Sequence, residues 1–348
     1  MSLVCPFCNA DPAPDVPVSG SYVLLGCVRC YNPLIACLEV EGHKARALPG
    51  ANDVRAMAPK GSIGGTIFAE LPDVLDRLPV LPAISIKVLA LVDDAQSSMP
   101  GLAKLIREDS VIAAQILKIA NSAFYGGLSE ITELDVACAR LGMRTISNAV
   151  NTVATANLFE SKDPGITRLL ERLRTHSIVT AFAANELANL LSEPKPESLY
   201  FAGLFHDVGK IALLDIIAKS TADTVDQLRQ SPGLVHEVLH NYHQLVGLHT
   251  IGRWNLPHDF GVTTYFHNNP EAVHVDAWRR RTHIVALANV IAHVSGFGLE
   301  EESAELSLLG HPSAAFLNMT DIKLANLRVD LEEKFEQARD AFGVAVPA

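Results

Sequence analysis

Apolar residues recur at helical spacing through almost all of the chain beyond residue 70. In residues 111–120, for example, Ile112, Ile116 and Ile119 fall on one face of a helix. The alternating β-branched runs that strands require are few in this part, and we find no convincing internal repeat. The pattern therefore predicts a mainly all-α protein.

Proline and capping residues mark where these helices should begin. A Ser or Asp just before the first turn, or a Pro within it, is typical of helix starts. We expect starts at Pro82, Ser98, Asp163-Pro164 and Pro232. Leu141-Gly142 should separate two helices, over 133–140 and 143–159.

The last predicted helix carries a narrow apolar seam. Thr320 is its expected cap, and its apolar residues follow at alternating steps of three and four: Leu324, Leu327, Leu331, Phe335, Ala338 and Phe342. A seam of this kind predicts packing against the helix's own domain; a dimer contact is the alternative.

Four of the six cysteines predict a separate metal-binding module at the N-terminus. Cys5-x2-Cys8 and Cys27-x2-Cys30 are 18 residues apart, the spacing of a four-Cys zinc ribbon. In a reducing cytosol, zinc is favoured over disulfides. We predict a ribbon over residues 1–40, with short strands near 22–25 and 34–38, then a Gly- and Pro-rich linker over 41–70.

Net charge and hydropathy exclude two classes of partner. The net charge is −11, from 28 basic and 39 acidic side chains, whereas nucleic-acid binding requires a basic surface. The longest apolar run, Ile284 to Phe297, is too short to cross a membrane. The N-terminus lacks the basic-then-apolar order of a signal peptide. We expect a soluble cytoplasmic protein that binds neither nucleic acid nor membranes.

Phe205-His206-Asp207-Val208-Gly209-Lys210 is the stretch with the clearest chemical content. The apolar segment 198–204 before it predicts a buried helix, and Gly209 offers a stop for that helix. A buried imidazole and carboxylate are costly unless something satisfies them. A metal ion is one answer; a partner Arg or a hydrogen-bond network is another.

Further polar residues stand in apolar helical surroundings before and after this stretch. They are His176, His243, His267 and Asn289, each on a different predicted helix. A helix bundle can direct such side chains to one point and build a metal site there. A lone buried His is more often a satisfied core residue, so the case depends on the combination with His206-Asp207. His236 and His240 are expected to be solvated.

These motifs resemble those of the HDOD family, the HD-related output domain of bacterial signalling proteins within the HD phosphohydrolase superfamily. The motifs that carry the resemblance cover roughly residues 70–300, in this order: Leu78-Pro79-Val80-Leu81-Pro82, Ile119-Ala120-Asn121-Ser122-Ala123-Phe124-Tyr125, Leu141-Gly142, Phe205-His206-Asp207-Val208-Gly209-Lys210, His243-x3-Gly247 and Trp254-Asn255-Leu256-Pro257. The resemblance implies an HDOD-specific helical subdomain over 71–160 and an HD-like subdomain over 161–300. Residues 301–348 would follow as a C-terminal segment with an amphipathic helix.

The resemblance also implies a set of site residues. His176, His206, Asp207, His243, His267 and Asn289 correspond to the HD metal ligands. Asp207 could bridge two ions, and Lys210 would steady a phosphate oxygen. Mixed His and carboxylate ligation fits iron, manganese, nickel or zinc. Asn289 stands where HD enzymes carry an Asp; its carbonyl oxygen has no charge and holds an ion less firmly.

Two functions from different classes follow. The first is a signal-transduction or regulatory module that acts through a protein partner and keeps part of an HD metal site. Asn289 and the family's loss of metal residues in many members favour it. The alternative is a metal-dependent phosphohydrolase or phosphodiesterase, with Asp207 and Lys210 in catalysis and a phosphodiester or nucleotide ligand.

Overall fold

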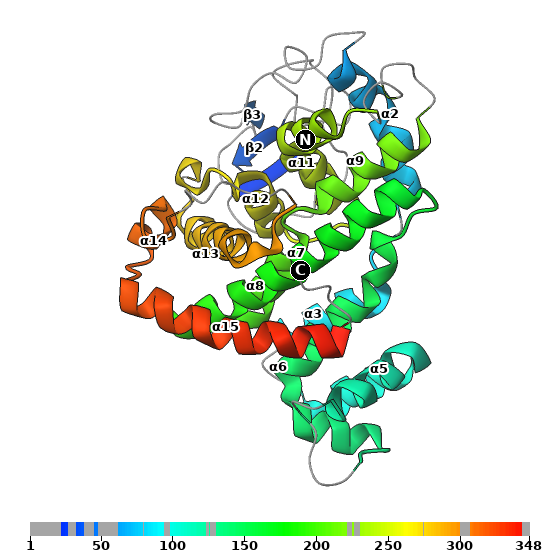
Figure 1. Cartoon of the computed structure of the whole chain (residues 1–348), viewed down its shortest axis with the longest axis vertical. Coiled ribbons are helices and arrows are strands. Elements are labelled where there is room, and N and C mark those ends of the chain that lie inside the picture. The colour runs from blue at the N-terminus through cyan, green and yellow to red at the C-terminus, as the bar shows by residue number, and fades with distance from the viewer. Residues whose placement is uncertain are drawn as a thin grey trace. The chain divides into compact units, whose positions relative to one another are not determined.

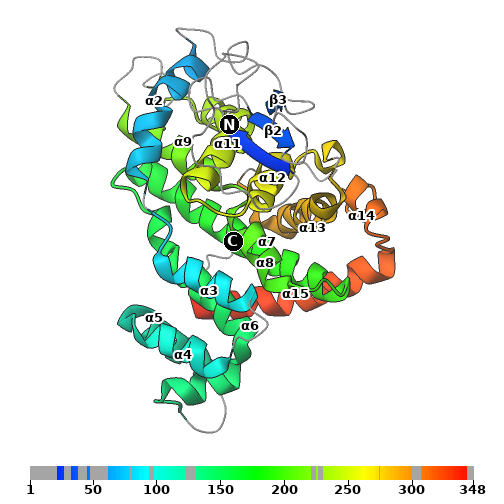
Figure 2. The same ribbon diagram turned by 180° about the vertical axis from the view of Figure 1, so that it is seen from behind.

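Figures 1 and 2 show the computed structural model of the chain from opposite sides. The structure describes residues 22–26, 33–37, 45–47, 62–78, 80–93, 98–122, 125, 130–220, 225, 230–273, 275–299 and 307–342. It is predominantly helical, as the sequence predicts. Within the described residues, no helix is both long and apolar enough to cross a membrane.

A small antiparallel sheet precedes the helices. Strand β1 (Tyr22–Gly26) pairs with β2 (Pro33–Cys37), which pairs with β3 (Ala45–Ala47). The first two strands coincide with the segments predicted as strands. The four cysteines of the predicted zinc ribbon (Cys5, Cys8, Cys27 and Cys30) lie outside the described residues, so the ribbon stays a prediction.

Packing divides the chain into two compact units. The first unit combines residues 1–78 with 206–282, and the second combines residues 79–205 with 283–348. Helix α13 (Asp276–Ala292) continues along the chain from the first into the second. The subdomain ranges expected from the sequence, 71–160 and 161–300, remain predictions.

In the part of the first unit that the structure describes, the long helices before α13 are α2 (Ile63–Arg77), α9 (Val208–Lys219), α11 (Pro232–Arg253) and α12 (His258–Phe266). A short 3-10 turn, Pro270–Ala272, follows α12. Helix α2 begins within the segment predicted as linker, because Ser62 accepts a hydrogen bond from the Gly65 N–H at 3.0 Å. Its Ile67, Leu71 and Val74 are fully buried and hold it on the unit's core.

Helices α9 and α11 pack backbone to backbone at one point. A Cβ atom at Gly209 would lie 1.9 Å from the carbonyl oxygen of His243 and 2.5 Å from the nitrogen of Gly247. Only a residue without a side chain fits there. The expectation that Gly209 ends a helix was wrong: α8 (Pro196–Phe205) ends earlier, and Gly209 lies in the first turn of α9.

The other helices that the structure describes lie in the second unit: α3 (Ala83–Asp93), α4 (Met99–Arg107), α5 (Ser110–Ala120), α6 (Leu134–Ala154), α7 (Pro164–Leu190), α8, α14 (Pro312–Phe316) and α15 (Asp321–Phe342), with a 3-10 turn at Ala156–Phe159 and a π-turn at His293–Phe297. The predicted caps are confirmed. Ser98 accepts from the Gly101 N–H, and Asp163 accepts from the N–H groups of two residues in the first turn of α7. The predicted break is confirmed as well: Gly142 has φ +76° inside α6.

Helices α3 to α6 form one packed group in this unit (Figure 2). Its aliphatic core includes the buried Cys138. Helices α7 and α8 approach closely at Gly203, where an added Cβ would lie 2.9 Å from the Cα of Ala181. Helix α15 buries Leu324 and Leu331 of the predicted seam and contacts α7. The seam therefore packs within its own unit, as expected.

Candidate metal centre

His206 and Asp207 connect the end of α8 to the start of α9. Asp207 occupies the cap position of α9, but its carboxylate makes no capping hydrogen bond. Its Oδ2 atom instead accepts from the Lys210 ammonium at 2.6 Å and lies 3.3 Å from Nε2 of His206. Lys210 and His206 therefore hold the carboxylate of Asp207 through Oδ2, and its other oxygen, Oδ1, is available to bind a metal ion.

Two helices of the same unit present imidazoles with fixed tautomers. His243 in α11 contacts the carbonyl oxygens of Leu239 and His240 through Nδ1, at 2.7 and 2.9 Å. His267, at the end of α12, contacts the carbonyl oxygen of Thr264 through Nδ1 at 2.8 Å. Because carbonyl oxygens only accept, each Nδ1 carries the proton and donates. Each Nε2 atom therefore presents a lone pair.

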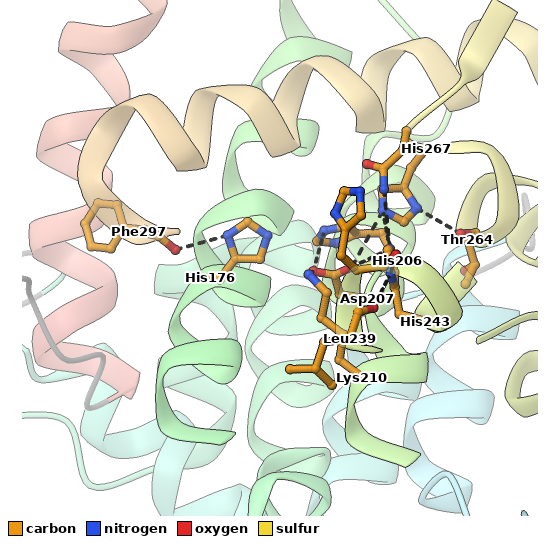
Figure 3. Close-up of polar contacts among 11 residues, drawn as sticks. His176, His206, Asp207, Lys210, Leu239, His243, Thr264, His267 and Phe297 are labelled. Carbon is orange, nitrogen blue, oxygen red and sulfur yellow. Dashed lines mark hydrogen bonds and ion pairs between the residues drawn. The ribbon is translucent and has the colours of Figure 1, made fainter. Parts of the chain in front are cut away.

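These lone pairs converge on Asp207 (Figure 3). The two Nε2 atoms are 3.3 Å apart, and they lie 3.4 and 3.6 Å from Oδ1 of the carboxylate. Asp207, His243 and His267 are thus arranged as three electron-pair donors around one point, and none of the three facing atoms supplies a proton. A cation is the natural complement. We call these residues the Asp207 cluster.

Burial and charge hold the cluster in its metal-binding protonation state. His206, Asp207, His243 and His267 are each at most 2 % exposed. Burial lowers the pKa of His243 to about 4, although the charge of Asp207 opposes the change. Burial also lowers the pKa of His267 well below its usual value, and His206 adds to the effect. Neutral imidazoles are the form that binds metals.

The Asp207 carboxyl is shifted by opposing effects. Burial alone would raise its pKa, but Lys210, His206 and His243 outweigh burial and hold the pKa well below the usual value. The carboxylate is therefore ionised at neutral pH. One negative charge beside neutral imidazoles attracts a divalent cation.

His176 and Asn289, the other predicted ligands, belong to the second unit and are described within it. His176 in α7 is fully buried, and its Nδ1 donates to the carbonyl oxygen of Phe297 at 3.1 Å (Figure 3). Its Nε2 is then also a lone-pair atom. Asn289 in α13 is buried, and its Oδ1 accepts no hydrogen bond from the described residues. Both residues keep the chemistry expected of ligands.

A comparison with models of known protein families shows which family this chain belongs to. The model of the HDOD domain matches residues 78–270, more than half of the chain. The chain belongs to the HDOD family. The resemblance seen in the motifs is confirmed for this part.

Several solved structures share the fold. An HDOD domain protein of unknown function from Geobacter sulfurreducens is 22% identical with a TM-score of 0.64, over 79% of this chain and 96% of that one. A candidate metal-dependent phosphohydrolase from Shewanella amazonensis is 18% identical with a TM-score of 0.56, over 80% and 99%. A candidate signal transduction protein from Marinobacter aquaeolei is 16% identical with a TM-score of 0.55, over 93% and 75%.

A curated relative, an uncharacterised protein from Treponema pallidum, is 23% identical over 79% of this HDOD chain. The chain spans about half (53%) of that relative's length. At these identities the comparisons establish the fold and leave the activity to be argued from the site.

Two neighbours of the predicted ligands were not assigned from the HDOD motifs. Asn268, which follows the predicted ligand His267, places its amide Nδ2 3.4 Å from Nε2 of His243. The ring of His293 lies 4.7 Å from that of His176, centroid to centroid. Its position four residues after Asn289, on one helical face, was an available signal. His240 is exposed, as expected.

Proposed function

We propose that this HDOD protein is a regulatory signalling module whose Asp207 cluster holds one divalent metal ion. The observation that carries the proposal is the convergence of two unprotonated Nε2 atoms and a carboxylate oxygen within 3.6 Å of one another. Two imidazoles and one carboxylate suit iron, manganese, nickel or zinc. When bound, the ion would lock α9, α11 and α12 together and could polarise a coordinated water.

Lys210 favours one ion over two at this cluster. A bridging carboxylate must offer one oxygen to each ion, and Oδ2 of Asp207 already accepts from the Lys210 ammonium at 2.6 Å. A second ion at Oδ2 would lie beside that ammonium and be repelled by its charge. Only Oδ1 faces the imidazoles of His243 and His267. From the HD resemblance, we propose His176, His206 and Asn289 as additional ligands, with Asn289 the weakest because it is uncharged.

Burial favours regulation over hydrolysis. A catalytic ion needs an open position for water and substrate, whereas structural sites are closed. The cluster residues are at most 2 % exposed. We therefore propose that the metal supports a fold that acts by contacting a signalling protein in the cytoplasm. In this proposal the N-terminal zinc ribbon (Cys5, Cys8, Cys27 and Cys30) provides a second contact module.

Lys210 also supplies the observation that favours a second candidate, a metal-dependent phosphohydrolase. Its ammonium lies beside the carboxylate, and its side chain is 13% exposed, so it could contact both the cluster and a phosphate oxygen. Asp207 would then be the central catalytic ligand. The Shewanella amazonensis relative carries a name of this class.

Thermal unfolding of the full chain tests the metal claim. After chelation, addition of Mn²⁺ should raise the midpoint of the wild type, because an ion that binds only the folded state stabilises it. Mn²⁺ is used because four thiolates, as in the proposed ribbon, favour softer ions such as zinc. His243→Ala should abolish the shift. His240→Ala, which removes an exposed imidazole of the same helix, should keep it. If both variants keep the metal-induced shift, the assignment of the metal to the Asp207 cluster is wrong.

Phosphodiesterase assays separate the two candidate functions. Bis-p-nitrophenyl phosphate and cyclic dinucleotides would be incubated with the metal-loaded protein. The regulatory proposal predicts no turnover above the metal-only blank. Turnover abolished by both Asp207→Asn and Lys210→Met would overturn it in favour of the hydrolase.

A further inference from the structure

A separate cavity of about 200 Å³ lies in the second unit, lined by residues of α5, α6, α7 and α15 and by Tyr125. None of its lining residues belongs to the Asp207 cluster or to the predicted metal ligands. Its volume is below the roughly 300–1,000 Å³ of pockets for drug-sized ligands. Any ligand it binds is therefore small.

Two asparagines with unsatisfied polar atoms line this cavity. Asn148 of α6 donates through Nδ2 to Oδ1 of Asn185 of α7, at 3.5 Å. Asn148 is 8 % exposed and Asn185 is 5 % exposed. The Oδ1 atom of the first and the Nδ2 group of the second are buried and have no hydrogen-bond partner among the described residues. Each such group costs free energy on burial.

The pair presents one donor and one acceptor whichever way the amides are turned. If both carboxamides are rotated by 180°, the contact between Asn148 and Asn185 persists with donor and acceptor exchanged. One N–H group and one carbonyl oxygen are again left over. The complement is a molecule with an acceptor and a donor side by side on one edge. Amide side chains read adenine through such an edge in nucleic-acid recognition.

The aromatic and charged side chains that line the cavity further restrict the class of ligand that it can bind. The rings of Phe182 and Phe342 line the cavity, with centroids 6.2 Å apart and planes tilted by 49°, so they contact each other. Together they form an apolar wall against which a flat aromatic ring can pack. The rim carries two cations, and each is already neutralised. Nε of Arg144 lies 2.8 Å from Glu197, and Nζ of Lys334 lies 2.5 Å from Glu186. The cavity has no surplus positive charge for a phosphate.

We propose that this cavity binds the base of an uncharged nucleoside, held by Asn148 and Asn185 and packed against the apolar wall of Phe182 and Phe342. The site is distinct from the metal cluster, so it stands or falls independently of the proposed function. Ordered water is the competing occupant, because water also satisfies buried amides. The two differ in that water requires neither the aromatic walls nor a base.

Calorimetric titration of the full chain tests the proposal. Adenosine, guanosine, cytidine and uridine would each be titrated, in the presence and absence of a metal chelator. At least one should bind saturably with the same affinity in both conditions. Asn148→Asp or Asn185→Asp changes the donor–acceptor pair into two acceptors and should weaken binding by about tenfold or more. Binding that the chelator abolishes would contradict the proposal.

A matched control lies on the same helix. Asn151 of α6 is also buried, at 1 % exposed, and its Oδ1 accepts no hydrogen bond from the described residues, but it does not line the cavity. Asn151→Asp should leave the affinity unchanged. Failure of all four nucleosides to bind the wild type, or equal weakening by all three substitutions, would overturn the proposal and leave a water-filled cavity.

A second measurement uses only the wild-type chain, so it does not depend on whether a variant folds. Crystals would be soaked with a bromine-labelled form of the nucleoside that binds. Anomalous signal from bromine between α6, α7 and α15 is the expected result. Signal elsewhere only, or none, would count against the site.

Discussion

Gly209→Ala tests the backbone contact that brings α9 against α11. The new Cβ would lie 1.9 Å from the carbonyl oxygen of His243, whereas ordinary contacts begin near 3.4 Å. The shortfall is about 1.5 Å, and both neighbours are backbone atoms of a helix that cannot rotate aside. Overpacked cores lose about 1–3 kcal/mol, and rigid contacts of this kind fall at the upper end. We expect a loss of about 3 kcal/mol or more in the free energy of unfolding.

The same substitution should weaken metal binding. Asp207 precedes the first turn of α9, and His243 supplies the atom that the new Cβ would meet. Separation of the two helices moves Oδ1 of the carboxylate away from the imidazoles. Disturbing the groups that orient metal ligands typically costs about 10- to 100-fold in affinity. We expect the affinity for Mn²⁺ to fall by about tenfold or more.

Urea unfolding followed by circular dichroism, on metal-free protein, measures the first effect. Gly233→Ala is the matched control, because a Cβ at this exposed position of α11 meets nothing within 4 Å. That control should be neutral or stabilise by up to about 1 kcal/mol, since alanine favours the helix. If Gly209→Ala and Gly233→Ala agree within about 0.5 kcal/mol, the close approach of α9 and α11 is wrong.

Three further predictions concern other buried contacts. Metal-free protein should lose stability as pH falls from about 6.5 to about 4. The pKa of His243 is about 4 in the folded state, so the imidazole takes up its proton at higher pH in the unfolded chain than in the folded one. A free energy of unfolding that stays constant or rises as pH falls over this range would contradict the prediction. Gly203→Ala should destabilise α7 against α8 by about 1–3 kcal/mol in a urea titration, since its Cβ would meet the Cα of Ala181 at 2.9 Å; an unchanged midpoint would refute the contact. Tyr200→Phe should cost about 1 kcal/mol by the same assay, because it removes the 2.6 Å hydrogen bond between the buried phenol and Thr152; a variant as stable as the wild type would show that this bond is absent.

Local signals in the sequence were sufficient for most helix boundaries. Ser98 and Asp163 cap helices by bonding N–H groups within three residues, so the information needed for the prediction is contiguous. Gly142 breaks α6 through its own backbone conformation. The burial of His206-Asp207 also followed from the neighbouring apolar segment, because a helix apolar on all sides must lie inside.

Contacts between helices were not predictable in this way. Gly209 looked like a helix stop because a glycine near a helix end usually is one. Its actual role depends on the carbonyl of His243, which the fold brings to it from a later helix. The contact between Asn148 and Asn185 likewise exists only once α6 and α7 pack, and neither residue stands in a recognisable motif.

The sequence likewise predicted which residues are candidate ligands, but not how their atoms are oriented. The sequence predicted His243 and His267 as ligands, but not the tautomers that make their Nε2 atoms acceptors. Those tautomers follow from bonds to carbonyls three and four residues earlier, in Thr264 and Leu239. Predicted helices at these positions could have suggested the tautomers, because a histidine side chain on a helix can donate to the carbonyl oxygen three or four residues earlier.

Anomalous diffraction from crystals of the full chain grown with Mn²⁺ tests the central claim most directly. We predict a manganese peak within about 2.0–2.3 Å of the Nε2 atoms of His243 and His267 and of Oδ1 of Asp207, the range of metal–nitrogen and metal–oxygen bonds in proteins. The peak should be absent in His243→Ala and present in His240→Ala. Ordered imidazoles with no peak between them, at saturating Mn²⁺, Fe²⁺, Ni²⁺ or Zn²⁺, would show that the cluster is not a metal site.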